Sequence, residues 1–431
     1  MGPRQRASLG ATTDALRRLG RERIGVYRGM FLKGLVQLPW RSAMRSVARA
    51  VPRESGLVAF GSVRNRLADN SAYLFLHMAQ ANDIRCVWIG GSPEVISKLR
   101  AEGLDARRRW SPGGLWAALR ASIYVYSFAP ADINVLLSDG AVTVNLWHGV
   151  GVKRIERDRG SPWDRMYAAG DRSLTARVFA DDRRPCDWLL STSPEMSAYF
   201  TRPFGISIDR CIEVGYPRND HLAAGTTPPS ALIDRPLYDA LREKELVVGY
   251  FPTWRYDSYS ALPEGAPDLD EIAQLVGEQG GVVLFKPHHQ SGMPPGTSES
   301  LVLLPADADL NAYLGLCDVL VTDYSSVAAD FLFLNRPIVI FAPDLDGDLA
   351  AGRFSIDPIE HQPGLLVRTT EELYALLREA RSIPLAENFK FLQSFYWSSS
   401  SEHSSEALAS FIRSRALGPA KSPSAARAET G

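Results

Sequence analysis

Short apolar runs alternate with helical segments along most of this chain, and this alternation constrains the fold more than any other sequence feature. Runs such as Leu57–Phe60, Arg85–Ile89 and Ser122–Tyr126 have the length and residue types of buried strands. A helical segment over 70–81 separates the first run from the second. Strands buried on both faces and separated by helices are typical of parallel sheets that helices cover. The sequence therefore predicts an α/β fold.

The alternation occurs in two blocks, and the second block begins at Leu246. A chain of 431 residues is too long for one ordinary core. We therefore expect two Rossmann-type, doubly wound domains over 51–230 and 231–417, with a cleft between their strand ends. The linker between them is expected within 222–235. The tail at 418–431 is rich in Ala, Ser and Pro and is expected to be disordered.

Residues 1–50 carry eleven Arg or Lys side chains against two acidic ones, Asp14 and Glu22. Apolar residues are interleaved with the basic ones from Ile24 to Trp40. This pattern favours a basic amphipathic helical segment that lies on an anionic membrane surface. The alternative is a helix that packs on a domain and exposes a basic face to solvent. No apolar run approaches the roughly 18 residues of a membrane-spanning helix, and no secretory signal is evident.

Several classes of site are disfavoured by the sequence. The net charge is −1, so bulk electrostatics does not indicate a nucleic-acid partner. The four cysteines form no Cys-x-x-Cys pair, so neither structural zinc nor a disulfide framework is expected, and we interpret them as reduced thiols of a cytosolic protein. No P-loop and no dinucleotide-binding glycine motif occurs, and no cofactor is expected. Two Asp-x-Asp strings, 307–309 and 344–346, lie in turn-rich stretches and do not by themselves predict a metal.

His148 is the first candidate catalytic residue. It follows Trp147 and precedes Gly149, directly after the strand-like run Ala141–Leu146. Ligands of open α/β sheets bind at the carboxyl ends of strands. Because the ordinary pKa of histidine is near 6.5, a histidine there suits a general base at neutral pH. The alternative is a structural histidine bonded to a nearby carbonyl.

Lys286, Pro287 and His288 follow the next candidate strand, Gly281–Phe285. A lysine supplies a point charge for a phosphate, a histidine donates a hydrogen bond to it, and the proline fixes the turn that aims both. His289 is a weaker candidate, because adjacent side chains at a strand end point in opposite directions. This motif indicates an enzyme that moves a phosphate-linked group.

Ser325 and Ser326 open a helix after the apolar run that ends at Thr322. Unpaired N–H groups at a helix N-terminus, together with two hydroxyls, suit phosphoryl oxygens. A plain N-cap is the alternative, and it needs only one serine. Asp330, about one turn further on, either reaches a substrate hydroxyl or is a charged group on the helix surface.

Arg218 and Arg255 are further candidate anion ligands, each with a carboxylate nearby in the sequence. The alternative for Arg218 is a pair with Asp220, and for Arg255 a pair with Asp257.

Together, these motifs resemble the CDP-glycerol:poly(glycerophosphate) glycerophosphotransferase family, which builds teichoic acids and related capsule polymers. The resemblance runs from about residue 57 to about residue 412. The motifs that carry it are Trp147-His148-Gly149 with Lys153, Gly215–Asp220, Phe251–Arg255, Lys286–His288, Thr322–Phe331, Pro363-Gly364 and Thr370–Leu373.

The resemblance implies a GT-B-like architecture and transfer of glycerol phosphate, or a related polyol phosphate, from a CDP-alcohol to a lipid-linked or growing surface polymer, with release of CMP. It also implies peripheral attachment to the cytoplasmic face of the cell membrane. His148 would deprotonate the acceptor hydroxyl, and His288 is the second expected catalytic residue. The implied donor-binding residues are Trp147, Gly149, Arg218, Pro252, Thr253, Arg255, Lys286, Pro287, Ser325, Ser326 and Asp330.

Two departures leave the polyol open. Val150-Gly151-Val152 stands where the family usually has Thr-Pro-Leu before the lysine, and Gly352-Arg353-Phe354 replaces an Arg-Gly-aromatic pattern. Two other hypotheses remain at this point, since a fold does not fix a function. One is a sugar-nucleotide glycosyltransferase or epimerase of the GT-B type. The other is a membrane-bound scaffold that binds a nucleotide-linked precursor without turning it over.

Overall fold

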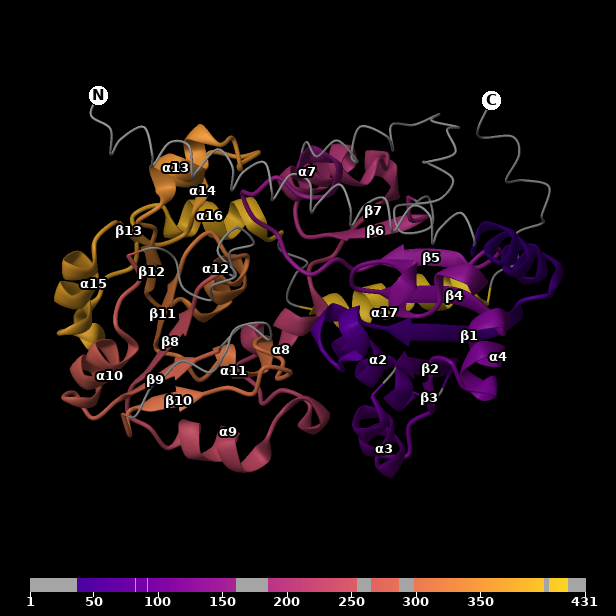
Figure 1. The fold of residues 1–431 in the computed structure, drawn as a ribbon, viewed down its shortest axis with the longest axis horizontal. Coiled ribbons are helices and arrows are strands. Elements are labelled where there is room, and N and C mark those ends of the chain that lie inside the picture. The colour runs from indigo at the N-terminus through magenta and orange to yellow at the C-terminus, as the bar shows by residue number, and fades with distance from the viewer. Residues whose placement is uncertain are drawn as a thin grey trace, which may run out of the picture.

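The computed structural model describes residues 37–81, 83–90, 92–159, 185–253, 265–286, 298–398 and 403–417. These residues form two lobes, each built around one sheet (Figure 1). The first sheet has the strand order β3-β2-β1-β4-β5-β6-β7, and the second has the order β10-β9-β8-β11-β12-β13. The described strand pairs are parallel. The expected GT-B-like pair of doubly wound domains is confirmed.

In the first lobe the strand order reverses between β1 and β4, as expected for a doubly wound sheet. Ligands of such sheets bind at the carboxyl ends of the strands beside this reversal. Its strands are β1 (Glu54–Gly61), β2 (Arg85–Gly90), β3 (Ala106–Arg108), β4 (Ala121–Tyr126), β5 (Val142–Asn145), β6 (Trp188–Ser191) and β7 (Cys211–Glu213). Its helices are α2 (Asp69–Ala81), α3 (Pro93–Ala101), α4 (Pro112–Arg120), α7 (Pro194–Phe204) and α8 (Asp220–Ala223).

The second lobe repeats this order, with the reversal between β8 and β11. Its strands are β8 (Val247–Phe251), β9 (Val282–Phe285), β10 (Leu301–Leu303), β11 (Val319–Thr322), β12 (Ile338–Phe341) and β13 (Leu365–Val367). The helices of this part of the chain are α9 (Arg235–Arg242), α10 (Leu269–Gly277), α11 (Asn311–Leu314), α12 (Val327–Phe331), α13 (Leu345–Ala350), α14 (Pro358–His361), α15 (Thr370–Leu377), α16 (Phe389–Tyr396) and α17 (Ser404–Ala416).

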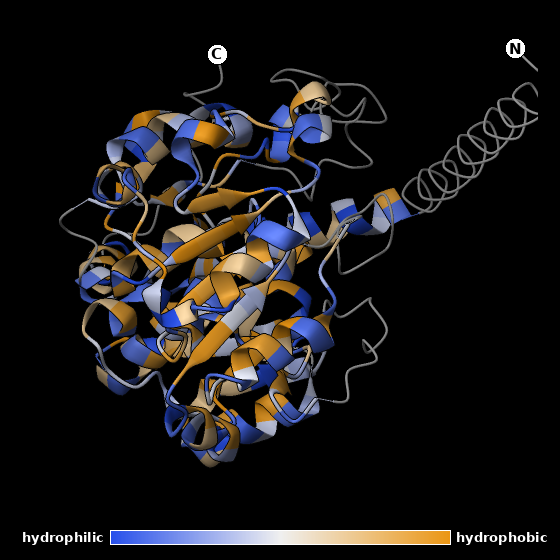
Figure 2. Ribbon diagram, turned by 90° about the vertical axis from the view of Figure 1, so that its left-hand side faces the viewer, coloured by the Kyte–Doolittle hydropathy of each residue, from blue (hydrophilic) through white to orange (hydrophobic). Residues whose placement is uncertain are grey.

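Local sequence explains most of these elements. Every residue of β8 and β9 is buried, so their continuous apolar runs belong to strands covered on both faces. Figure 2 shows hydrophobic strands between helices of mixed hydropathy. Ser92 caps α3 by accepting a hydrogen bond from the Val95 N–H, with Pro93 at the first helical position. Thr369 and Glu372 form a reciprocal capping box at α15.

Helix α17 corrects the expected domain boundary. A second domain that ends at residue 417 would include α17, but α17 packs against α2, β1 and β4 of the first lobe. The Ser55 hydroxyl donates to the Ala416 carbonyl at 2.9 Å, and the Phe411 ring packs edge-on against Trp188. The chain therefore crosses between the lobes twice, once near 220–235 and again after α16.

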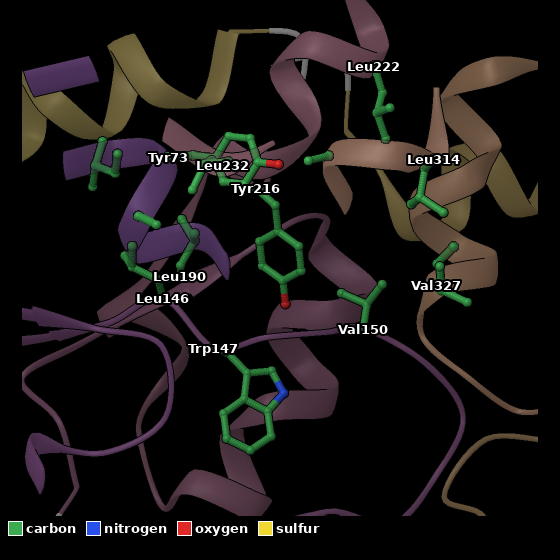
Figure 3. Close-up of a cluster of buried hydrophobic side chains, with 14 of the residues drawn as sticks. Tyr73, Leu146, Trp147, Val150, Leu190, Tyr216, Leu222, Leu232, Leu314 and Val327 are labelled. Carbon is green, nitrogen blue, oxygen red and sulfur yellow. The ribbon is translucent and has the colours of Figure 1, made fainter. Parts of the chain in front are cut away.

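The hydrophobic core is continuous between the lobes. One cluster of buried side chains includes Trp147 and Tyr216 of the first lobe together with Leu314 and Val327 of the second (Figure 3). Burial of each large apolar side chain contributes about 1.5–3 kcal/mol. The lobes are therefore joined by apolar packing around the residues that present the candidate site.

Residues 37–50 are helical, and their C-terminal part packs on the first lobe. Ala48 is fully buried, and Arg45 and Arg49 form ion pairs with Asp139 at 3.0 and 2.7 Å. This part of the expected basic segment therefore fits the packing alternative, while residues 1–36 lie outside the described residues. Within the part that the structure describes, no helix is both long and apolar enough to cross a membrane.

Candidate active site

The carboxyl ends of the two sheets face each other. The Lys153 ammonium donates a hydrogen bond to the Thr253 hydroxyl at 3.2 Å, and Lys153 forms an isolated antiparallel bridge with Phe354. Gly149 approaches Ser326 so closely that a Cβ at Gly149 would lie 2.3 Å from the Ser326 Oγ. The loop after β5 therefore lies directly against the segment after β11.

Hydrogen bonds to the backbone hold the turn that presents His148. The Asn145 carboxamide oxygen accepts from the Trp147 N–H at 2.9 Å, and the Asn70 amide donates to the Trp147 carbonyl at 3.0 Å. Trp147 has a φ of 51°, in the left-handed region that side chains other than glycine rarely adopt. Such a conformation costs about 1–3 kcal/mol and persists only where the surroundings enforce it. Asn70 and Asn145 supply that enforcement.

The environment of the His148 ring favours a neutral imidazole that accepts protons at Nε2. Nδ1 lies 3.2 Å from the Ser127 carbonyl, and because a carbonyl only accepts, Nδ1 carries the proton. The ring contacts Trp147, with ring centroids 3.9 Å apart. Burial lowers the pKa of His148, and the nearby Asp69 carboxylate opposes this effect. Among the described residues, Nε2 has no hydrogen-bond partner, so this atom remains available to a substrate hydroxyl.

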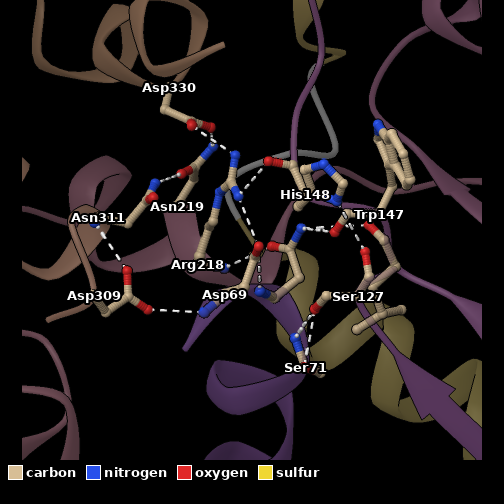
Figure 4. A network of polar contacts seen from close by, with 12 residues as sticks. Asp69, Ser71, Ser127, Trp147, His148, Arg218, Asn219, Asp309, Asn311 and Asp330 are labelled. Carbon is tan, nitrogen blue, oxygen red and sulfur yellow. Dashed lines mark hydrogen bonds and ion pairs between the residues drawn. The ribbon is translucent and has the colours of Figure 1, made fainter. Parts of the chain in front are cut away.

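Arg218 connects His148 to both lobes (Figure 4). Its guanidinium donates to the Asp69 carboxylate at 2.7 Å, to the His148 carbonyl at 2.8 Å and to the Asp330 carboxylate at 2.7 Å. Arg218 is 3% exposed and Asp330 is 1% exposed. Burial alone would lower the pKa of Arg218, but the two carboxylates raise it above its ordinary value. Arg218 is therefore a permanent buried cation that holds the His148 backbone.

Two of the alternatives weighed from the sequence are wrong. Arg218 does not pair with Asp220, whose carboxylate instead accepts from the backbone N–H groups of Ser404 and Ser405 at 3.0 and 2.8 Å. Asp330 is not a charged group on the helix surface, because it is buried and paired with Arg218. These two expected donor-site residues bind each other between the lobes.

The second lobe contributes hydroxyls and one lysine. The Thr253 N–H donates to the Asp323 carboxylate at 3.1 Å, and the Thr253 hydroxyl donates to the same group. Pro252, which precedes Thr253, is half-buried at the end of β8. Ser325 and Ser326 are also half-buried and open α12, as expected. The Ser326 side chain makes no capping bond.

The Lys286 ammonium lies at the carboxyl end of β9 and donates to the carbonyls of Ala306 and Ala308 at 3.1 and 2.8 Å. Burial lowers the pKa of Lys286 to about 8, and repulsion from Arg66 contributes. A lysine with this pKa still carries its positive charge most of the time at neutral pH.

Three expected site residues, Arg255, Pro287 and His288, lie outside the described residues, as does the alternative partner Asp257. The expected catalytic role of His288 and the expected donor-binding roles of Arg255 and Pro287 therefore stay predictions.

The structure also reveals contributors that the sequence analysis missed. Asp69 and Asn70 begin α2 after β1, and Ser127 follows β4. A usable signal was present, because each of these residues follows a predicted strand at the carboxyl edge of the sheet. Asp309, from one of the Asp-x-Asp strings, accepts from the Asp69 N–H at 2.8 Å.

Comparison with known proteins identifies similar sequences. A family model described as CDP-Glycerol:Poly(glycerophosphate) glycerophosphotransferase matches residues 43–413. The teichoic acid poly(glycerol phosphate) polymerase of Bacillus subtilis (strain 168) is 31% identical over 290 residues, which cover 65% of this chain and 38% of that protein. The protein of the same name from Bacillus spizizenii is 26% identical over 364 residues, covering 80% of this chain and 88% of that protein. This chain thus spans about two fifths of the first relative and most of the second.

A structural relative has the same fold. A variant of the wall teichoic acid polymerase TagF matches with a TM-score of 0.69 and 21% identity, covering 90% of this chain and 97% of that chain. At this identity the similarity shows the fold alone.

Proposed function

This chain belongs to the CDP-glycerol:poly(glycerophosphate) glycerophosphotransferase family, and we propose on that basis that it transfers glycerol phosphate, or a related polyol phosphate, from a CDP-alcohol to a hydroxyl of a lipid-linked or growing cell-surface polymer. CMP is the second product. The names of the relatives, teichoic acid glycerol-phosphate and ribitol-phosphate polymerases and transferases, support a polyol phosphate as the transferred group.

The environment of His148 is the observation that carries this proposal. Its Nδ1–H bonds the Ser127 carbonyl, its backbone is held by Arg218, and its Nε2 is left without a partner among the described residues. A lowered pKa keeps the ring neutral at the pH of a cell. These are the properties of a general base at a strand end that faces a second domain.

In the proposed reaction, Nε2 of His148 removes the proton of the acceptor hydroxyl. The acceptor oxygen then forms a bond to the β-phosphorus of the CDP-alcohol, and the bond from that phosphorus to the bridging oxygen breaks. The electron pair of the broken bond leaves with CMP, and the product is a phosphodiester.

Positioning and charge stabilisation supply most of the catalysis in such a transfer. The Lys286 charge offsets the developing charge on the departing phosphate. The hydroxyls of Ser325 and Ser326 are suitable donors to phosphoryl oxygens. By family resemblance, His288 binds the diphosphate from the second lobe and Arg255 adds a further positive charge.

The test is incubation of the full chain with a panel of CDP-alcohols and lipid-linked acceptors, with released nucleotide and product length as readouts. We expect CMP release that requires an acceptor. His148→Ala should lose nearly all turnover, whereas His77→Ala, which removes a surface histidine paired with Glu406, should retain it. Wild-type activity with undiminished turnover in His148→Ala contradicts the catalytic assignment. UDP release from a sugar nucleotide, or CDP binding without any product, contradicts the proposed reaction.

We also propose peripheral attachment to the cytoplasmic face of the cell membrane. The excess of basic residues in 1–50 and the exposed Trp40 side chain, which is 64% exposed, support this location. Co-sedimentation with vesicles that contain anionic lipid tests it. Binding should weaken in a chain that lacks residues 1–36, and equal binding of the two chains argues against the proposal.

A further inference from the structure

The loop between β1 and α2, residues 62–68, lies beside the candidate site. Within it, the short 3-10 helix Val63–Asn65 packs on the turn Pro130–Asp132. That turn begins two residues after Phe128, whose ring centroid lies 5.7 Å from that of His148. The loop therefore belongs to the same carboxyl edge of the first sheet as the proposed base.

The end of this loop also contacts the second lobe close to Lys286. Asp69 follows the loop, and its N–H donates to the Asp309 carboxylate at 2.8 Å. The adjacent Ala308 carbonyl accepts from the Lys286 ammonium at 2.8 Å. Arg66 is thus brought near Lys286 from the opposite lobe, and its charge contributes to the lowered pKa of that lysine.

Arg66 has no acidic partner among the described residues, although its guanidinium lies near another positive charge. Its Nε is buried without a hydrogen bond, and no carboxylate in the described part of the chain forms an ion pair with it. Buried polar groups are ordinarily paired, so the Arg66 Nε requires a hydrogen-bond acceptor that the described residues do not supply.

The surroundings define the charge of that ligand. Two cations from opposite lobes repel each other unless an anion lies with them, and Arg is well suited to bind phosphate through two parallel hydrogen bonds. The nearby Asp309 offsets part of the Lys286 charge. Its carboxylate, however, already accepts from the backbone N–H groups of Asp69 and Asn311.

We propose that Arg66, together with Lys286, binds a phosphate group of the substrate between the lobes. This inference rests on the proposed function, and it assigns to Arg66 a binding role that the sequence motifs did not indicate. The phosphate belongs either to the diphosphate of the donor or to the phosphodiester next to the attacking hydroxyl of the acceptor. Both groups present the same anionic oxygens.

The test compares Arg66→Gln and Arg66→Lys with Arg64→Gln, a matched control that removes one exposed positive charge from the same loop. Loss of a charged hydrogen bond raises a dissociation constant about tenfold or more. We expect Arg66→Gln to raise the KM for either the CDP-alcohol or the acceptor by at least about tenfold. Arg66→Lys should recover part of the lost affinity, and Arg64→Gln should match the wild type.

The source of the phosphate follows from which KM changes. A higher KM for a poly(glycerol phosphate) acceptor, with no change for a neutral lipid-linked acceptor, assigns Arg66 to the acceptor. A higher KM for CDP-glycerol with both acceptors assigns Arg66 to the donor. Equal KM values for Arg66→Gln and Arg64→Gln overturn the proposal.

A second measurement does not depend on turnover. Calorimetric titration with CDP and with bis(glycerol) phosphate reports binding directly, and at least one should bind more weakly to Arg66→Gln than to Arg64→Gln. Failure of the proposed reaction would remove CMP release from the wild type but would leave this difference in binding. Equal binding of both probes to the two variants refutes the role of Arg66 independently.

Discussion

The close approach of Gly149 to Ser326 predicts that Gly149→Ala damages both stability and activity. A Cβ at Gly149 would lie 2.3 Å from the Ser326 Oγ and 2.6 Å from the Ser326 Cβ, whereas ordinary contact begins at 3.4 Å. Rotation of the serine moves Oγ but leaves Cβ in place. The loop after β5 and the segment after β11 must therefore separate by about 0.8 Å.

The size of the effect follows from this displacement. Overpacking of this kind costs about 1–3 kcal/mol of the free energy of unfolding. Gly149 directly follows His148, so the displacement also moves the proposed base relative to the second lobe. A misplacement of about 1 Å lowers a rate on the order of a hundredfold. We therefore expect a modest loss of stability and a much larger proportional loss of kcat.

Urea unfolding and CMP release measure the two effects, with Gly347→Ala as the control, because no atom lies within 4 Å of a Cβ at that helical glycine. In a Ser326→Gly background the Oγ and Cβ atoms that would clash are absent. Gly149→Ala should then lower the free energy of unfolding only slightly. Wild-type kcat and stability in Gly149→Ala would refute the reasoning. An undiminished stability cost in the Ser326→Gly background would show that the strain has another origin.

Two predictions concern pH. Because the pKa of His148 is lowered, the acidic limb of kcat/KM should fall below the ordinary histidine value of about 6.5; a limb above that value contradicts a neutral, buried base. Burial raises the pKa of Asp132 to about 7, so the folded chain retains a proton that the unfolded chain, with a pKa of about 3.9, has lost. Stability should therefore decrease between about pH 4 and 7, by up to about 4 kcal/mol at 1.36 kcal/mol per unit. Asp132→Asn should remove this slope in urea titrations, and parallel stability curves for the two proteins would refute the assignment.

The sequence predicted the elements that apolar patterning specifies. The runs that became β1, β2, β4, β8 and β9 each contain at least four consecutive residues that are apolar or glycine, so their burial is evident without a structure. The edge strands β3, β10 and β13 were missed, because each has only three residues and is partly exposed. A run of that length contains too few positions to establish a period.

The candidate site was predicted in part, because motifs identify side chains but not their partners. The sequence indicated Arg218 and Asp330, but not that they bind each other, since residues separated by 112 positions meet only through the tertiary fold. The left-handed conformation of Trp147 was equally inaccessible, because it depends on bonds from Asn70 and Asn145. Local propensity does not encode such contacts.

The double crossing of the chain constrains how the lobes can move. Beyond the first connection near 220–235, the second lobe is attached again where the Ser398 N–H donates to the Thr192 carbonyl at 2.7 Å. Two connections restrain a rotation of one lobe against the other more than a single connection would. A chain cut before Ser404 would keep the second sheet intact but would lack α17, which packs on α2 and β1. The first lobe would therefore lose stability, although the cut lies near the other end of the chain.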